Sequence, residues 1–117
     1  MISELHTKTL DAATLKELRK TVQLNQQKFA KLSNNSRETL ITFEKTGRVS
    51  KGAKRGITEA VRLIEALSEI IEPKNIASWL TATNPNLRSK SPLDLIEEGR
   101  VDIIWSIIEE TRQGTFA

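Results

Sequence analysis

Residues 25–47 read NQQKFAKLSNNSRETLITFEKTG, and this stretch decides the fold of the first half of the chain. It predicts two short helices joined by a tight turn. Asn25 and Ser36 stand where the helices begin, because their side-chain oxygens can accept hydrogen bonds from the first free backbone N–H groups. Asn34 and Asn35 lie between the two runs, and asparagine tolerates the left-handed backbone that a sharp corner needs.

The second of these helices is more polar than a core helix needs to be. Leu40 and Phe43 lie three positions apart, so they share one face and can anchor the helix. The residues left for the other faces are Arg37, Glu38, Ile41, Thr42 and Lys45. A helix held by two apolar residues that turns an Arg, a Glu and a Thr outward has the composition of a recognition helix in the major groove of DNA.

The composition of the 117 residues excludes several classes of function. The chain has no Cys and a single histidine, His6, so we expect no metal site and no disulfide. It has no Gly-rich phosphate loop after a strand and no paired carboxylates between apolar walls, so we do not expect an enzyme or a bound cofactor. The start lacks a secretion signal, and no window approaches the roughly 20 apolar residues of a membrane span. We therefore expect a cytoplasmic protein that has no contact with membranes.

Charge is distributed unevenly along the chain. Residues 1–57 hold 12 Lys and Arg against 5 Asp and Glu, a net charge of +7, whereas residues 58–117 hold 6 against 10, a net charge of −4. A basic half that also contains the two-helix stretch is expected of a protein that binds phosphates, and the same polyanion would repel the acidic half. The alternative is that this charge asymmetry only keeps the protein soluble. The difference places a domain boundary between residues 57 and 58.

The remaining pattern predicts an all-α protein, because apolar residues recur at three- and four-residue spacing and strict alternation is absent. We expect a helix after Asp11 that runs to about residue 22. Residues 46–56, TGRVSKGAKRG, hold three Gly and four cations and are expected to form a basic loop. Further helices are expected over residues 58–72, 76–82, 91–99 and 100–113. Trp79 and Trp105 lie within apolar stripes and are expected in the core.

The residues that carry a family resemblance in the first half are spread over three predicted helices: Leu15, Leu18, Arg19, Leu24, Gln26, Phe29, Ala30, Ser36, Arg37, Thr39, Leu40, Phe43, Glu44 and Gly47. On these residues, positions 15–47 resemble a Cro/C1-type helix-turn-helix of the Xre superfamily. In place of the family's usual Gly-Val in the turn, this chain has Asn34-Asn35, and Gln23 replaces the Gly before Leu24.

The resemblance implies a role for each polar residue of this unit. Gln26 would contact a phosphate and support the recognition helix, which Ser36 begins. Its base-contacting residues would be Arg37, Glu38 and Thr42, and Arg to guanine and Glu to cytosine are sound pairings. Lys45 and Arg48 would contact phosphates, which supply affinity rather than sequence recognition. The alternative is that the helix-turn-helix is plain scaffold, with Glu38 paired to a neighbouring cation.

A second set of residues lies along the second half: Arg62-Leu63, Ala77, Trp79-Leu80, Asn84-Pro85-Asn86-Leu87, Ser91-Pro92-Leu93-Asp94-Leu95-Ile96, Gly99, Gly114 and Phe116. On this set, residues 60–117 are similar to the toxin-binding domain of Xre/MbcA/ParS antitoxins. Arg88-Ser89-Lys90 stand where the family has a Gly. The resemblance implies a RES-type toxin as partner, an enzyme that consumes NAD or transfers ADP-ribose.

Such antitoxins block the cleft of the toxin with their C-terminal region. Here Phe116 and the carboxylate of Ala117 would enter a pocket built for an anionic dinucleotide. The expected toxin-binding residues are Arg100, Arg112, Gln113, Gly114, Thr115, Phe116 and Ala117. Phe116 could instead fold onto its own final helix, and Arg100 and Asp102 could simply cap and solvate the start of that helix.

Together these resemblances predict an antitoxin of a type II toxin–antitoxin system, which neutralises its toxin by direct binding and represses its own operon by binding operator DNA. Operators for this fold are usually inverted repeats with half-sites one helical turn apart, roughly 34 Å, so we expect a homodimer. The alternative is a stand-alone Xre-family transcriptional repressor whose C-terminal helices only dimerise. A reading frame for a RES-type enzyme beside this one would decide between them.

Overall fold

The computed structural model describes residues 10–114, and in this range the chain is entirely helical apart from its connections. The predicted all-α class is therefore confirmed. The helices are α1 (Ala12–Thr21), α2 (Gln26–Leu32), α3 (Arg37–Thr46), α4 (Lys51–Ser68), α5 (Pro73–Thr81), the short 3-10 helix η2 (Pro85–Leu87), α6 (Pro92–Glu97) and α7 (Val101–Arg112).

Side-chain caps begin most of these helices, as the sequence predicts. Asp11, Asn25 and Ser36 each accept a hydrogen bond from the backbone N–H three residues further on, at 2.7, 2.8 and 3.0 Å. Ser91 and Asp94 form a reciprocal capping box, in which each side chain accepts from the backbone N–H of the other. The hydrogen bonds from Ser91 hold the pKa of Asp94 below its ordinary value. The caps fix where α1, α2, α3 and α6 start.

The predicted basic loop over residues 46–56 is wrong in its second half. The helix α4 begins at Lys51, where Ser50 caps it by accepting a hydrogen bond from the N–H of Ala53, and only residues 47–50 are left as a connection. The helix also ends at Ser68 rather than near residue 72. The next helix begins at Pro73 instead of residue 76, because proline suits the first helical position.

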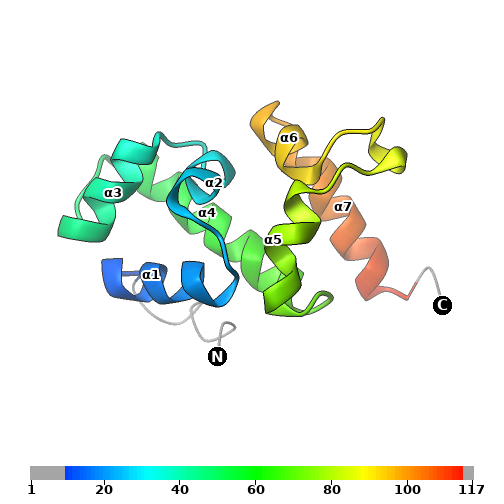
Figure 1. Ribbon diagram of the computed structural model, residues 1–117, viewed down its shortest axis with the longest axis horizontal. Coiled ribbons are helices and arrows are strands. Elements are labelled where there is room, and N and C mark those ends of the chain that lie inside the picture. The colour runs from blue at the N-terminus through cyan, green and yellow to red at the C-terminus, as the bar shows by residue number, and fades with distance from the viewer. Residues whose placement is uncertain (1–9, 115–117) are drawn as a thin grey trace.

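The long helix α4 connects two groups of helices. Figure 1 shows α1, α2 and α3 around the first part of α4 and α5, α6 and α7 toward the other end. Direct contact between α2 and α6 also joins the two groups, while α4 contacts both α5 and α7. The predicted domain boundary, between residues 57 and 58, lies inside α4.

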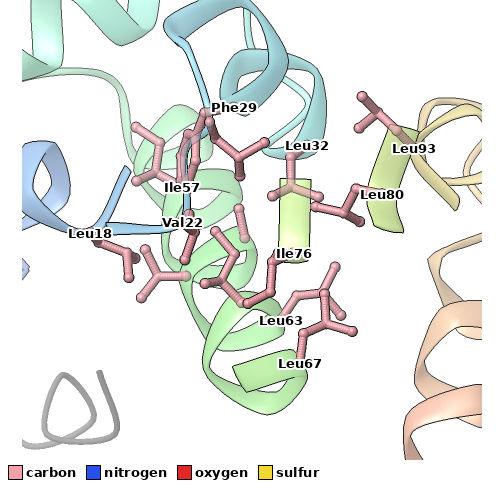
Figure 2. Packing of buried hydrophobic residues seen from close by; sticks show 14 of the residues in the cluster. Leu18, Val22, Phe29, Leu32, Ile57, Leu63, Leu67, Ile76, Leu80 and Leu93 are labelled. Carbon is pink, nitrogen blue, oxygen red and sulfur yellow. The ribbon is translucent and has the colours of Figure 1, made fainter. Parts of the chain in front are cut away.

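One hydrophobic cluster runs through both groups of helices. It includes Leu18 from α1, Phe29 from α2, Leu63 from α4 and Ile76 from α5, which Figure 2 shows converging around α4. Buried leucine and isoleucine side chains on α6 and α7 extend the cluster to the far end. None of the helices within residues 10–114 is both long and apolar enough to cross a membrane.

Candidate nucleic-acid interface

The helices α2 and α3 are joined by the four residues 33–36, which form a sharp corner. Asn34 adopts the left-handed backbone there, with φ +58°, as the sequence predicts. Gln23 adopts the same conformation before α2, with φ +60°. On the far side of the corner, Leu40 and Phe43 are fully buried and hold α3 against the core. The predicted anchor residues of α3 are thus confirmed.

A partly buried ion pair connects α3 to α1. The guanidinium of Arg19 donates to both carboxylate oxygens of Glu44, from Nε to Oε2 at 2.8 Å and from Nη2 to Oε1 at 3.0 Å. A third donor, Nη1, reaches the backbone carbonyl oxygen of Leu24 at 3.0 Å. The side chains of Arg19 and Glu44 are only 12% and 3% exposed, so water competes little with this bidentate contact.

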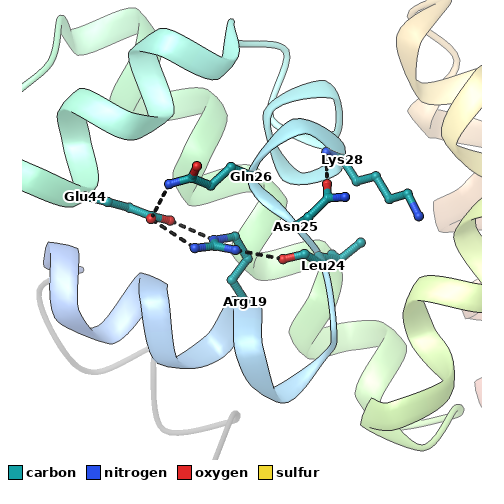
Figure 3. Close-up of polar contacts among 6 residues, drawn as sticks. All are labelled: Arg19, Leu24, Asn25, Gln26, Lys28 and Glu44. Atoms are coloured by element: carbon teal, nitrogen blue, oxygen red, sulfur yellow. Dashed lines mark hydrogen bonds and ion pairs between the residues drawn. The ribbon is translucent and has the colours of Figure 1, made fainter.

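The amide of Gln26 completes the network by donating from Nε2 to Oε1 of Glu44 at 3.1 Å (Figure 3). Burial raises the pKa of Glu44, but the hydrogen bonds from Arg19 and Gln26 and the charges of Arg19 and Lys16 outweigh it, so the pKa lies below its ordinary value. Glu44 therefore stays ionised. One carboxylate, on α3, is held by side chains from α1 and α2, and this fixes the positions of the three helices relative to one another.

The outer face of α3 carries the polar residues that the sequence singled out. Arg37, Glu38, Thr42 and Lys45 are all exposed. Ser36, which caps the helix, also donates from Oγ to the hydroxyl of Thr39 at 2.9 Å. Among residues 10–114, Glu38 has no ion-pair partner, so it is not occupied by a neighbouring cation.

A depression of about 490 Å³ lies between this face of α3 and the start of α4. It brings together Glu38, Thr42 and Arg48 from the predicted set and adds Asn35 and Ser50, which the sequence interpretation did not assign to the site. The remaining predicted residues, Gln26, Ser36, Arg37 and Lys45, do not line it.

The corner between α2 and α3 is tied to α4. The side-chain amide of Asn35 donates to the carbonyl oxygens of Ser33 and Ala53, at 3.2 and 3.1 Å. At Gly56 the backbone of α4 passes so close that a Cβ would collide with the carbonyl oxygen of Ser33. Such an approach is open to glycine alone. This contact between distant segments is what sequence reasoning missed when it placed residues 51–56 in a loop.

The described residues of the predicted toxin-binding set fall into two groups. Arg112 lies at the end of α7, where Nη2 contacts Oε1 of Glu69 at 2.6 Å. Gln113 and Gly114 follow it, and Gly114 has the positive φ, +69°, expected after a helix. Arg100 lies at the opposite end of α7, paired with Asp102 at 3.2 Å. The remaining three predicted residues, Thr115, Phe116 and Ala117, lie outside the described residues.

The prediction that Trp105 belongs to the core is wrong. The core side of α7 is formed by Ile104 and Ile108, which are fully buried. Trp105 is 37% exposed, and so is Val101, one helical turn earlier. Trp79 is half-buried and packs against the edge of the cluster. Helical spacing places Ile103, Ile104, Trp105, Ile107 and Ile108 on one broad face of α7, but of these only Ile104 and Ile108 are buried.

Comparison with protein-family models, with curated proteins and with solved structures found no match to this chain. Within the described part of the chain, no group of three or more His, Cys, Asp or Glu side chains is placed to hold a metal ion.

Proposed function

We propose that this chain is the antitoxin of a type II toxin–antitoxin system, in which α2 and α3 form a helix-turn-helix that binds operator DNA and the C-terminal region binds a RES-type toxin. The observation that carries the proposal is the outer face of α3. It exposes Arg37, Glu38 and Thr42 on a helix whose opposite side is fully buried and whose position is fixed by the Arg19–Glu44 ion pair.

The dimensions and chemistry of α3 suit a major groove. Ten helical residues span roughly 15 Å, and a major groove is about 12 Å wide and admits one helix. Arg37 can donate two hydrogen bonds to guanine, and Glu38 can accept one from the amine of cytosine. Lys45 and Arg48 have no ion-pair partner among the described residues, so their charges are available to phosphates.

Gln26 fits two tasks at once in this proposal. Its side-chain amide has two N–H donors, and only one of them is used by Glu44. The second can donate to a phosphate oxygen beside α2. The residue would then link the bound DNA backbone to the network that holds α3, so that backbone contact and base recognition share one rigid frame.

The toxin-binding half of the proposal rests on the resemblance of residues 60–117 to Xre/MbcA/ParS antitoxins. The acidic charge of this half supports it, because DNA would repel these helices and leave them open to a protein. The proposed contact is formed by Arg112 at the end of α7 and by residues 113–117.

The DNA-binding half is tested by titrating the chain into labelled DNA taken from upstream of its own reading frame, with unrelated DNA of equal length as competitor. We expect selective binding that weakens steeply with salt, because Lys and Arg displace counterions from phosphates. Equal affinity for both DNAs would contradict the proposed binding to an operator.

The toxin-binding half is tested by co-expression with the neighbouring RES-type reading frame in a growth assay. We expect the full chain to restore growth and a chain lacking Thr115–Ala117 to fail. Restored growth with the truncated chain would show that the tail does not block the toxin. Selective DNA binding without any toxin neutralisation would favour the stand-alone repressor instead.

A further inference from the structure

A groove of about 730 Å³ lies where the two groups of helices meet. One wall is α4, and the opposite wall is formed by the end of α6 and the start of α7. Residues 32–34, at the end of α2 and in its corner with α3, close one side. Gly52 and Gly56 line the groove on α4 and contribute no side chain that would fill it. The groove is separate from the depression beside α3.

The α7 wall carries an exposed apolar patch. Val101 and Trp105, four residues apart, share one face of the helix and both line the groove. They are the two large hydrophobic side chains that stay exposed within residues 10–114. Half-buried Ile96 extends the patch onto α6. A tryptophan beside aliphatic residues is the usual anchor of a protein–protein contact.

Both walls carry charged side chains, with an excess of cations on α4 and a carboxylate on the opposite wall. Arg55 and Arg62 lie on α4, with Glu59 between them, and Glu97 lies on α6. None of these four forms an ion pair with another described residue. Glu98 differs, because it is paired with Lys90 at 2.7 Å. Among the described residues, the groove therefore offers two unpaired cations and one unpaired carboxylate on the α4 wall, and an unpaired carboxylate beside the apolar patch on the other wall.

We infer that this groove binds a second copy of the same chain. A two-fold contact places the same surface on both partners, so the surface must be complementary to itself. Here the wall formed by α6 and α7 of one protomer, with Glu97 and Trp105, would face the α4 wall of the other, with Arg55 and Arg62. The reverse contact would repeat this arrangement. A polyanion such as DNA would instead fit a groove lined by cations without carboxylates. The inference rests on the proposed function for its purpose, because an inverted-repeat operator requires a two-fold dimer.

Sedimentation velocity of the full chain without DNA tests the inference. We expect a dimer at micromolar concentration and a rise of at least about tenfold in its dissociation constant for Trp105→Ala. Circular dichroism of each variant confirms that it is folded. Lys20→Glu reverses a cation outside the groove and serves as the matched control, with the wild-type dissociation constant expected.

Charge reversal makes the test independent of the tryptophan. Arg62→Glu and Glu97→Arg are each expected to weaken the dimer, because each places like charges opposite one another in both halves of the contact. An equimolar mixture of the two variants should form heterodimers more tightly than either variant self-associates. Dimers that tolerate Trp105→Ala and both reversals would overturn the inference, as would a wild-type chain that stays monomeric.

Three further outcomes separate this inference from the proposed function. Tight operator binding by a monomeric chain would overturn the groove contact and leave DNA binding intact. A stable dimer that depends on the groove but has no selectivity for DNA would support the groove contact and contradict the proposed operator binding. A monomeric chain that needs Trp105 to bind its toxin would assign the groove to that protein and overturn the inference.

Discussion

The outer faces of α3 and α7 differ in what they expose. The face of α3 presents Arg37, Glu38 and Thr42, while Leu40 and Phe43 on its inner side are fully buried. The face of α7 presents Trp105 and Val101, each 37% exposed. The helix α3 is connected to α1 by a partly buried ion pair. The helix α7 is held by buried isoleucines and by the Arg112–Glu69 contact at its end.

Under the proposed function, this difference would separate two kinds of recognition in one small chain. Base edges and phosphates are recognised by polar groups held at fixed positions, and α3 meets both conditions. Protein surfaces are recognised by apolar anchors with a charged rim, which matches the start of α7. The long helix α4 touches both sites, because it lines the depression beside α3 and the groove beside α7.

The largest expected effect comes from breaking the frame that holds α3. Arg19→Ala leaves the Glu44 carboxylate buried without its cation, and the free energy of unfolding should fall by about 3–5 kcal/mol. Urea denaturation measures the change. Lys74→Ala removes an exposed pair with Glu72 and is the control, for which little change is expected. Equal midpoints for the two variants would mean that α3 is not held by this pair.

The same frame predicts a dependence on pH. The pKa of Glu44 is lowered in the folded chain, so its ionised form stabilises the fold above the ordinary glutamate pKa of about 4.3. That contribution is lost as the pH falls below this value toward the lowered pKa. Glu44→Gln lacks the titrating group, so its stability should change less than that of the wild type over the same acid range. Parallel curves would contradict the assignment.

Two adjacent residues test the outer face of α7. Ile104→Ala empties a fully buried position and should cost about 2–5 kcal/mol in the free energy of unfolding. Trp105→Ala removes a larger side chain at an exposed position, so its cost should be clearly smaller. Thermal and urea unfolding of both variants give the comparison. A larger cost for Trp105→Ala would place the tryptophan in the core after all.

Two glycines of α4 test the close contact between α4 and the corner that joins α2 to α3. Gly56→Ala forces a Cβ into the carbonyl oxygen of Ser33 and should destabilise the chain by about 1–3 kcal/mol. Gly52→Ala adds a methyl group with nothing within 4 Å, so it should stabilise the helix by about 0.5–1 kcal/mol. Opposite signs in urea denaturation are expected. Stabilisation by both substitutions would show that α4 does not lie in close contact with Ser33 at the corner.

Another small effect is expected in the loop before α6. Ser89 has φ +63°, a left-handed conformation that favours glycine, and Ser89→Gly should raise the free energy of unfolding by about 1 kcal/mol. Ser106→Gly makes the same change within α7, where glycine should destabilise by a similar amount. Unfolding midpoints that move in the same direction for both would contradict the assigned conformation.

Local signals carried much of the fold. The caps at Asp11, Asn25, Ser36 and Ser91 were predictable, because each depends on backbone groups only three residues away. The exposed polar face of α3 followed from helical periodicity. These features need no knowledge of distant segments, and the structure confirms them.

The errors arose where distant segments decide the outcome. The start of α4 looked like a loop because Gly52 and Gly56 weaken a helix, and only the approach of Ser33 explains Gly56. Arg19 and Glu44 are 25 residues apart, so their ion pair could not be inferred from spacing. Helical periodicity placed Trp105 on an apolar stripe but could not tell which edge of that stripe the neighbouring helices would leave open.

The most direct test of the central claim compares two residues of α3 in a salt-controlled titration against operator and unrelated DNA. Arg37→Ala should lose about 1–3 kcal/mol of operator affinity and much of its selectivity, because a base contact is removed. Lys45→Ala should weaken binding to both DNAs alike and lower the salt slope by about 1. If Arg37→Ala binds the operator as tightly and as selectively as the wild type, the outer face of α3 is not the recognition surface.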